Sequence, residues 1–85
     1  SKEISGNEPL LAFDGGMMGI KIIQKLIADS PRFLRSNGWL IFELGVGQGP
    51  FLLRLLEGSE AYGKTEAFTD NSGNIRAIAA QKTNI

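Results

Sequence analysis

The sequence contains neither cysteine nor histidine, and each absence removes a class of chemistry. Without cysteine, the chain has no disulfide, no thiolate nucleophile and no sulfur ligand for zinc, a composition compatible with a reducing cytosol. Histidine is the usual general base near neutral pH and the commonest metal ligand. Its absence excludes Ser-His-Asp catalysis and most transition-metal sites within these residues.

The chain also lacks an excess of charge and a long apolar run. Because 9 basic and 9 acidic side chains cancel, we expect no direct binding to nucleic acid or to an anionic membrane. No stretch approaches the roughly 20 apolar residues of a membrane span, and the first residues lack the apolar core of a signal peptide. At 85 residues we expect one domain at most, and a cytoplasmic location.

What is present is a polar lead at residues 1–8, followed by segments with the patterns of a folded domain at residues 9–85. A short apolar stretch stops at the turn-forming sequence Asp14-Gly15-Gly16. Apolar positions at three- and four-residue spacing then predict a helix over residues 17–34. Pro31 interrupts this pattern, so the helix either kinks there or restarts with Ser30 as its N-cap.

A strand, a second helix and a hairpin are predicted for the rest of the chain. The nearly unbroken apolar run at residues 39–44 predicts a strand that is covered on both faces, as in α/β sheets. Residues 50–57 have the pattern of a short helix that begins at its proline. Strand-like runs at residues 63–69 and 74–81 flank an Asp-Asn-Ser-Gly turn and predict an antiparallel hairpin. The predicted fold class is therefore α/β.

Several separated blocks of the sequence carry a family resemblance through their order and spacing. The blocks are Glu8-Pro9-Leu10-Leu11-Ala12-Phe13-Asp14-Gly15-Gly16 with Gly19, then residues 30–40, Glu43-Leu44-Gly45 with Gln48-Gly49, and the spaced Asp70, Gly73 and Arg76. Together they resemble the C-terminal part of the HemK-type family, the glutamine N5-methyltransferases that modify peptide-chain release factors. The match extends over nearly the whole chain from Glu8 onward.

The resemblance implies a class I, Rossmann-like methyltransferase fold, of which this chain carries a helix-strand-helix unit and an antiparallel hairpin. It also implies that the parent protein transfers a methyl group from S-adenosylmethionine to the side-chain amide of a glutamine in a release factor. The family's Asn-Pro-Pro-Tyr active-site loop is absent, since Pro9, Pro31 and Pro50 are not adjacent. We therefore expect part of a longer enzyme, with no catalytic residue, no bound cofactor and no activity of its own.

Candidate substrate-binding residues lie at the two glycine-rich turns. The carboxyl ends of strands are where α/β sheets bind ligands, which makes Glu43 and Gln48 candidates for a substrate-facing role. The turn formed by Asp14, Gly15 and Gly16 is a candidate for a substrate-facing loop. Each has a structural alternative, because a carboxylate in a covered strand needs donors such as the N–H groups near Gln48, and Asp-Gly-Gly often forms only a turn.

The spacing of Glu43, Gly45, Gly47 and Gly49 has a second interpretation. It fits the acidic-Gly-x-Gly-x-Gly loop that binds S-adenosylmethionine in class I methyltransferases, with an acidic residue about 20 positions onward holding the ribose. However, Pro50 removes one of the N–H groups that the following helix would offer to a cofactor. This favours the alternative that the segment is the end of a later strand of the sheet, with no cofactor bound to it.

A third interpretation is a non-enzymatic interaction module. An apolar strand at residues 39–44 without a neighbour on one side invites pairing with another copy, which predicts a homo-oligomer through this strand. Two smaller expectations concern charged side chains. Asp70 and Arg76 should pair across the hairpin, and Lys82 should lie in solvent.

Overall fold

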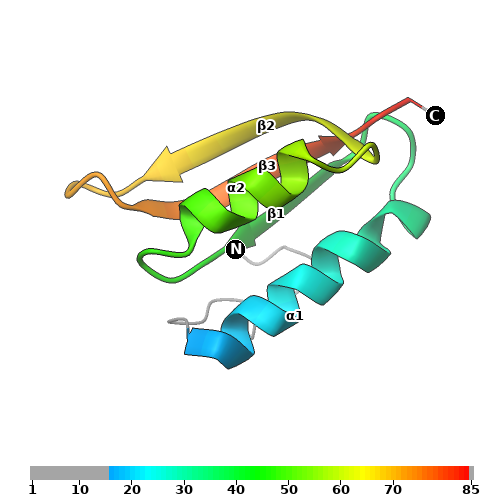
Figure 1. Cartoon of the computed structure of the whole chain (residues 1–85). Helices are drawn as coiled ribbons and strands as arrows, with labels where there is room; N and C mark the ends of the chain where they lie inside the picture. Colours follow the sequence, from blue (N-terminus) through cyan, green and yellow to red (C-terminus); the bar gives the residue numbers. More distant parts are fainter. Residues whose placement is uncertain (1–15, 85) are drawn as a thin grey trace.

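The computed structural model describes residues 16–84, arranged as two α-helices, one short 3₁₀ helix and three strands within that range (Figure 1). The elements are α1 (Gly16–Asp29), η2 (Ser30–Arg32), β1 (Trp39–Glu43), α2 (Gly49–Glu57), β2 (Tyr62–Thr69) and β3 (Ile75–Lys82). This order confirms the predicted sequence of helix, strand, helix and hairpin, and with it the α/β class.

The three strands form one antiparallel sheet in the order β1-β3-β2. The last strand is therefore the central one, because β3 pairs with β1 on one side and with β2 on the other. The antiparallel hairpin of β2 and β3 was predicted, whereas the insertion of β3 beside β1 was not. Among the described residues, β1 and β2 are the edges of the sheet.

The first helix ends earlier than its apolar pattern predicts. α1 stops at Asp29, and the chain restarts as η2 with Pro31 among its first residues. This restart was one of the two predicted alternatives, although Asp29 rather than Ser30 is the N-cap and no side-chain hydrogen bond caps the turn. The physical reason is that proline has no N–H to donate inside a helix but is tolerated in a first turn.

Two side chains of the sheet hold the end of α1 and the turn that follows. The Lys82 ammonium donates to the carbonyls of Pro31 and Leu34 at 2.7 and 2.9 Å. The Tyr62 hydroxyl donates to the carbonyl of Ile27 at 2.6 Å. Because the last carbonyls of a helix have no intrahelical donors, these bonds satisfy acceptors that would otherwise be orphaned. The expectation that Lys82 lies in solvent was wrong, since it is half-buried.

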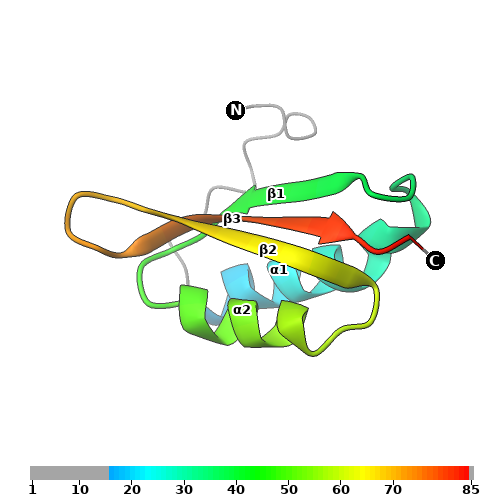
Figure 2. The ribbon, with the colours of Figure 1, turned by 90° about the horizontal axis from the view of Figure 1, so that it is seen from above.

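Both helices lie on the same face of the sheet, and we call this the helix-covered face (Figure 2). Side chains from α1, α2 and all three strands meet there in a single core. Its buried members are Ile23, Ile27, Leu40, Phe42, Leu44, Leu52, Leu56, Tyr62, Ile78 and Ala80. Burial of apolar side chains on this face is the main force that holds the elements together.

The opposite side of the sheet, which we call the open face, is not covered by a helix of the described residues (Figure 2). It carries Trp39, Ile41 and Glu43 of β1 and Glu66 and Phe68 of β2, placed there by the strand registers. Burial along β1 alternates accordingly, with the odd positions exposed. The prediction that this strand is covered on both faces was therefore wrong, because this part of the chain supplies a single helical layer.

Candidate functional site at the carboxyl end of β1

The carboxyl end of β1 is joined to the hairpin by Arg76. The backbone N–H of Leu44 donates to the carbonyl of Arg76 at 3.0 Å, and Arg76 Nε donates to the carbonyl of Leu44 at 3.2 Å. A guanidinium nitrogen of Arg76 also lies 3.8 Å from a carboxylate oxygen of Asp70, which confirms the predicted pair. The hairpin thus fixes the point at which the chain leaves β1.

Asp70 organises the turn of the hairpin through its other carboxylate oxygen. Oδ1 accepts hydrogen bonds from the backbone N–H groups of Ser72 at 2.9 Å and Asn74 at 3.0 Å. The N–H of Asn74 is the main reason that the pKa of Asp70 lies below its usual value, and the charge of Arg76 adds a smaller effect in the same direction. The side chain is therefore a turn-forming carboxylate.

Gln48 closes the loop between β1 and α2. Its Oε1 accepts a hydrogen bond from the Gly45 N–H at 3.1 Å, and its own backbone N–H donates to the Gly45 carbonyl at 3.2 Å. The Gln48 carbonyl then accepts from Leu52, which begins the hydrogen-bond ladder of α2. Because this side chain is buried and engaged within its own loop, its geometry agrees with the structural alternative for Gln48.

Two positions of the same loop favour glycine for different physical reasons. Gly47 has a φ of 91°, in the left-handed region that glycine tolerates best, and a Cβ there would meet nothing within 4 Å. Gly49 has an ordinary φ, but a Cβ on it would lie 2.7 Å from the Cβ of Ile75. The glycine spacing is thus explained at these positions by a turn and by close packing of α2 on β3.

Glu43 is exposed at the last position of β1 on the open face. Within residues 16–84 it has no hydrogen bond or ion pair, so the structural alternative, a covered carboxylate bonded to N–H groups near Gln48, is not observed. One such donor, the Gly45 N–H, is bonded to the Gln48 side chain. The structure therefore leaves the Glu43 carboxylate available to a partner.

The remaining predicted site residues lie at or beyond the start of the described chain. Asp14 and Gly15 fall outside the described residues, and Gly16 is the first residue of α1. In residues 16–84, no group of acidic side chains is arranged to hold a metal ion. In the same range, no helix is both long and apolar enough to cross a membrane.

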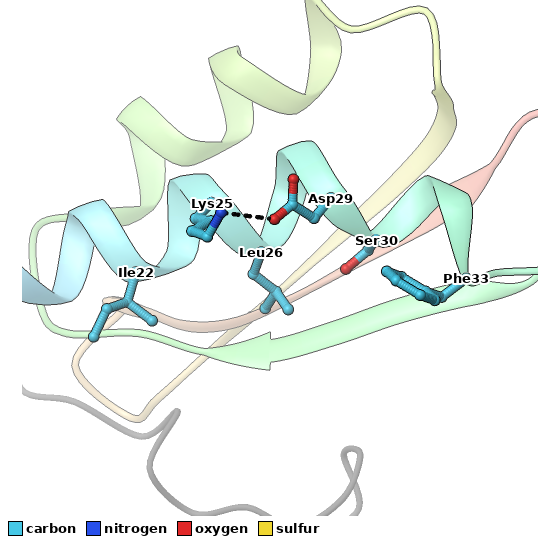
Figure 3. Close-up of a pocket in the computed structure, with 6 residues that line it drawn as sticks. All are labelled: Ile22, Lys25, Leu26, Asp29, Ser30 and Phe33. Atoms are coloured by element: carbon cyan, nitrogen blue, oxygen red, sulfur yellow. Dashed lines mark ion pairs between the residues drawn. The ribbon is translucent and has the colours of Figure 1, made fainter.

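A shallow hollow lies away from the β1 end, along the flank of α1, and we call it the α1 groove (Figure 3). It is lined by Ile22, Lys25, Leu26, Asp29, Ser30 and Phe33. Lys25 and Asp29 form an ion pair of 3.1 Å at its rim. The floor is mostly apolar, and Phe33 is 80% exposed beside it. Sequence patterns predicted the helix but not this hollow.

Comparison with curated proteins connects the chain with one group of enzymes. It is 38% identical over 79 residues to the release factor glutamine methyltransferase of Thermosynechococcus vestitus, a match covering 93% of this chain. The enzyme of the same name from Synechocystis is 35% identical over 93% of the chain, and that from Pseudomonas aeruginosa is 34% identical over 87%. The predicted resemblance is confirmed.

The match is to part of each relative. The chain spans only 26–27% of the length of these release factor glutamine methyltransferases. A shorter match, 44% identical over 48% of the chain, is to the ribosomal protein uL3 glutamine methyltransferase of Bradyrhizobium diazoefficiens. No family model and no solved structure matches the chain. All of these relatives are therefore named as glutamine methyltransferases, but their names give different substrates.

Proposed function

We propose that this chain is the C-terminal part of a release factor glutamine methyltransferase with a Rossmann-like fold. The whole protein would transfer a methyl group from S-adenosylmethionine to the side-chain amide nitrogen of a glutamine in a peptide-chain release factor. The observation that carries this proposal is the 38% identity to an enzyme of that name over 93% of the chain. The strand-helix-hairpin order of β1, α2, β2 and β3 agrees with it.

The described residues favour a supporting role in this reaction. Methyl transfer replaces an amide hydrogen by a methyl group and releases a proton, and S-adenosylmethionine supplies the electrophilic methyl group when it is bound. The β1–α2 loop fits this cofactor poorly, because the Gly45 N–H is already bonded to Gln48 and Pro50 has no N–H. We therefore assign cofactor binding and the Asn-Pro-Pro-Tyr loop, which would orient the amide, to polypeptide outside this chain.

Within this proposal, the chain supplies one wall of the substrate crevice. Glu43 is exposed at a strand end, where its carboxylate can accept a hydrogen bond from the amide of a bound glutamine. Gln48 would act by holding the loop beside it, and the turn of Asp14, Gly15 and Gly16 would contribute backbone groups. By itself the chain would be inactive, since none of these residues activates an amide nitrogen.

A chimeric enzyme tests this function. In the Thermosynechococcus enzyme, the 79 matched residues would be replaced by those of this chain, and methylation of release factor and of uL3 would be followed by mass spectrometry. We expect a methylated release factor, and a slower rate for Glu43→Gln at unchanged stability. Glu66→Gln, another exposed carboxylate of the open face, is the matched control. A folded chimera that methylates neither protein would contradict the proposal.

The isolated chain tests the alternative cofactor loop. We expect calorimetric titration of the 85-residue chain with S-adenosylmethionine to show no binding. Measurable binding that is abolished by Gly47→Val would instead assign Glu43, Gly45, Gly47 and Gly49 to the cofactor. Gly73→Val, at a second glycine with positive φ in the distal hairpin turn, controls for a general loss of fold.

A further inference from the structure

The turn between η2 and β1 contains an asparagine in an unusual backbone conformation. Asn37 has a φ of 67°, and among the described residues it is the only one other than glycine with a positive φ. Asparagine is one of the few residues that adopt this left-handed region. At the next position, a Cβ on Gly38 would lie 2.9 Å from the carbonyl oxygen of Arg35. The turn therefore favours asparagine or glycine at position 37 and requires glycine at position 38.

An asparagine that precedes a glycine can react with its own backbone. The Gly38 nitrogen attacks Cγ of Asn37, a C–N bond forms, and the bond from Cγ to Nδ2 breaks. Ammonia leaves with the proton of the Gly38 N–H, and a succinimide ring remains. Water then opens the ring at Cγ, which gives aspartate, or at the backbone carbonyl, which gives isoaspartate. Glycine obstructs this attack least because it has no Cβ.

The reacting side chain is accessible, but the peptide group that must attack it is held. Asn37 is exposed, and its side-chain amide makes no hydrogen bond within residues 16–84. The Gly38 N–H donates to the carbonyl of Arg35 at 2.9 Å, and the Asn37 carbonyl accepts from Nε2 of Gln81 at 2.9 Å. While both bonds last, this peptide group cannot turn its nitrogen toward Cγ. The reaction therefore requires a local opening of the turn.

We propose that Asn37–Gly38 is a site of spontaneous deamidation controlled by the Gln81 side chain, and that isoaspartate formed there releases the start of β1 from the end of β3. The Asn37 N–H donates to the Lys82 carbonyl at 3.2 Å, and the Lys82 N–H donates to the Gly38 carbonyl at 2.8 Å (Figure 1). Isoaspartate adds one carbon to the main chain between these two positions. Both bonds to Lys82 then lose their spacing.

The loss of these bonds would also reach the end of the first helix. The same Lys82 donates its ammonium to the carbonyls of Pro31 and Leu34 at 2.7 and 2.9 Å. A displaced Lys82 backbone moves this ammonium away from its acceptors. Aspartate, the other product, keeps the length of the main chain and should preserve all of these bonds. The structural consequence is therefore specific to isoaspartate.

The first test compares deamidation in the folded and the unfolded 85-residue chain. Trypsin releases residues 36–54 as one peptide, in which Asn37 is the only asparagine, and mass spectrometry follows the replacement of its amide by a carboxyl group. Each of the two hydrogen bonds on the Asn37–Gly38 peptide group should slow the reaction roughly fivefold, so the folded chain should react about 25 times more slowly than the chain in guanidinium chloride. Hydrogen exchange of the Gly38 amide measures the same opening without a substitution.

A substitution of Gln81 isolates its hydrogen bond. Gln81→Met keeps the length of the side chain but has no N–H to donate, so the folded chain should deamidate roughly fivefold faster and the unfolded chain at the same rate as wild type. The matched control is Lys64→Met, because Lys64 is exposed and lies opposite Gln81 in the strand register. This control should react at the wild-type rate. Circular dichroism checks the fold of both variants.

Two further controls test the reactive pair itself. Asn37→Gly removes the side-chain amide and suits a φ of 67°, so residues 36–54 should stay unmodified and the chain should be at least as stable as wild type in urea. Asn71 is an internal reference, because it is also exposed but precedes a serine, whose side chain hinders attack. The tryptic peptide of residues 65–76, which carries Asn71 and Asn74, should react more slowly than residues 36–54 in the unfolded chain.

The effect of the product is measured on chains separated after deamidation. An endoproteinase that cleaves before aspartate but not before isoaspartate distinguishes the two products. The chain with isoaspartate at position 37 should unfold at a lower urea concentration than the chain with aspartate. Hydrogen exchange at the Lys82 amide should also be faster, because its bond to the Gly38 carbonyl is lost.

Four outcomes would overturn this proposal. Residues 36–54 could stay unmodified in the unfolded chain, or isoaspartate could leave the exchange of the Lys82 amide unchanged. The folded wild-type chain could react as fast as the unfolded chain although its Gly38 amide is protected, which decides the matter even if Gln81→Met does not fold. A folded Gln81→Met chain could also react at the wild-type rate. None of these measurements involves methyl transfer, so they stand apart from the proposed function.

Discussion

The two faces of one sheet differ sharply although they are built from alternate residues of the same strands. On the helix-covered face, Leu40 is 9% exposed, and Phe42 and Ile78 are fully buried. On the open face, Trp39 is 39% exposed, Ile41 50% and Phe68 49%. β1 thus carries more apolar surface than this part of the chain covers. We infer that the helix-covered face provides most of the stability of residues 16–84.

The largest expected effect is truncation on the covered face. Phe42→Ala should cost about 3–5 kcal/mol in the free energy of unfolding, because it removes a fully buried ring. That loss is comparable to the whole stability of a small domain. Ile41→Ala, the neighbouring residue on the open face, should cost less than about 1 kcal/mol. Urea unfolding followed by circular dichroism measures both, and equal losses would break the contrast between the faces.

The next largest expected effect is at the contact of α2 with β3. Gly49→Ala should cost about 1–3 kcal/mol, since a Cβ there lies within 2.9 Å of three carbons of Ile75. Combination with Ile75→Ala should recover part of this cost, because two of those three carbons are removed. Gly47→Ala serves as the control in urea unfolding. Its cost comes from a φ of 91° rather than from a neighbour, so Ile75→Ala should not relieve it.

The hydrogen bond from the Tyr62 hydroxyl to the Ile27 carbonyl connects the sheet to α1. Removing this bond tests how strongly it holds α1 on the helix-covered face. Tyr62→Phe should cost about 1 kcal/mol. Burial raises the pKa of Tyr62 from 10.0 to about 12, so the folded state favours the neutral phenol, and the stability linked to this preference is fully present below pH 10 and is lost as the pH rises toward 12.

Tyr62 is the only tyrosine, so its ultraviolet titration reports the phenol directly. Between pH 9 and pH 11 the loss of stability should be larger in the wild-type chain than in Tyr62→Phe, and the difference between the two chains reports the phenol. A phenol that titrates near 10 in the folded chain would contradict the buried position.

The smallest expected effect is at the hairpin turn, which belongs to neither face. Asp70 is held ionised by the N–H groups of Asn74 and Ser72, and its pKa is lowered. Its contribution is therefore present above the unfolded pKa and is lost as the pH falls through the lower folded value. Asp70→Asn should abolish this acid dependence of the free energy of unfolding and Arg76→Gln should only reduce it, as measured by urea unfolding at neutral and acidic pH, with NMR titration of the Asp70 carboxyl group in the wild-type chain and in Arg76→Gln.

Much of the fold was predictable because local patterns decide it. The apolar spacing of α1, the proline at the start of α2 and the turn between β2 and β3 each specify an element through its own residues. The break near Pro31 was foreseen for the same reason. The pairing of β3 with β1 was not foreseen, since it depends on residues far apart in the sequence.

The candidate site was predictable in outline and not in detail. Its place at the end of β1 and the pair of Asp70 and Arg76 follow from the sequence pattern. The buried bond from the Gly45 N–H to Gln48 and the exposure of Glu43 depend on which face of β1 the helices cover. An apolar run specifies a strand, but it does not say which neighbour arrives to cover each face.

The sequence by itself determined the kinds of elements, their order and the resemblance to a methyltransferase, because each rests on residue types at short, fixed spacings. The tertiary structure alone decided that the last strand lies in the middle of the sheet formed by residues 16–84, and that both helices of this range lie on the same face of that sheet. Those features arise from contacts between distant residues, and burial selects among such contacts only when the whole chain is packed.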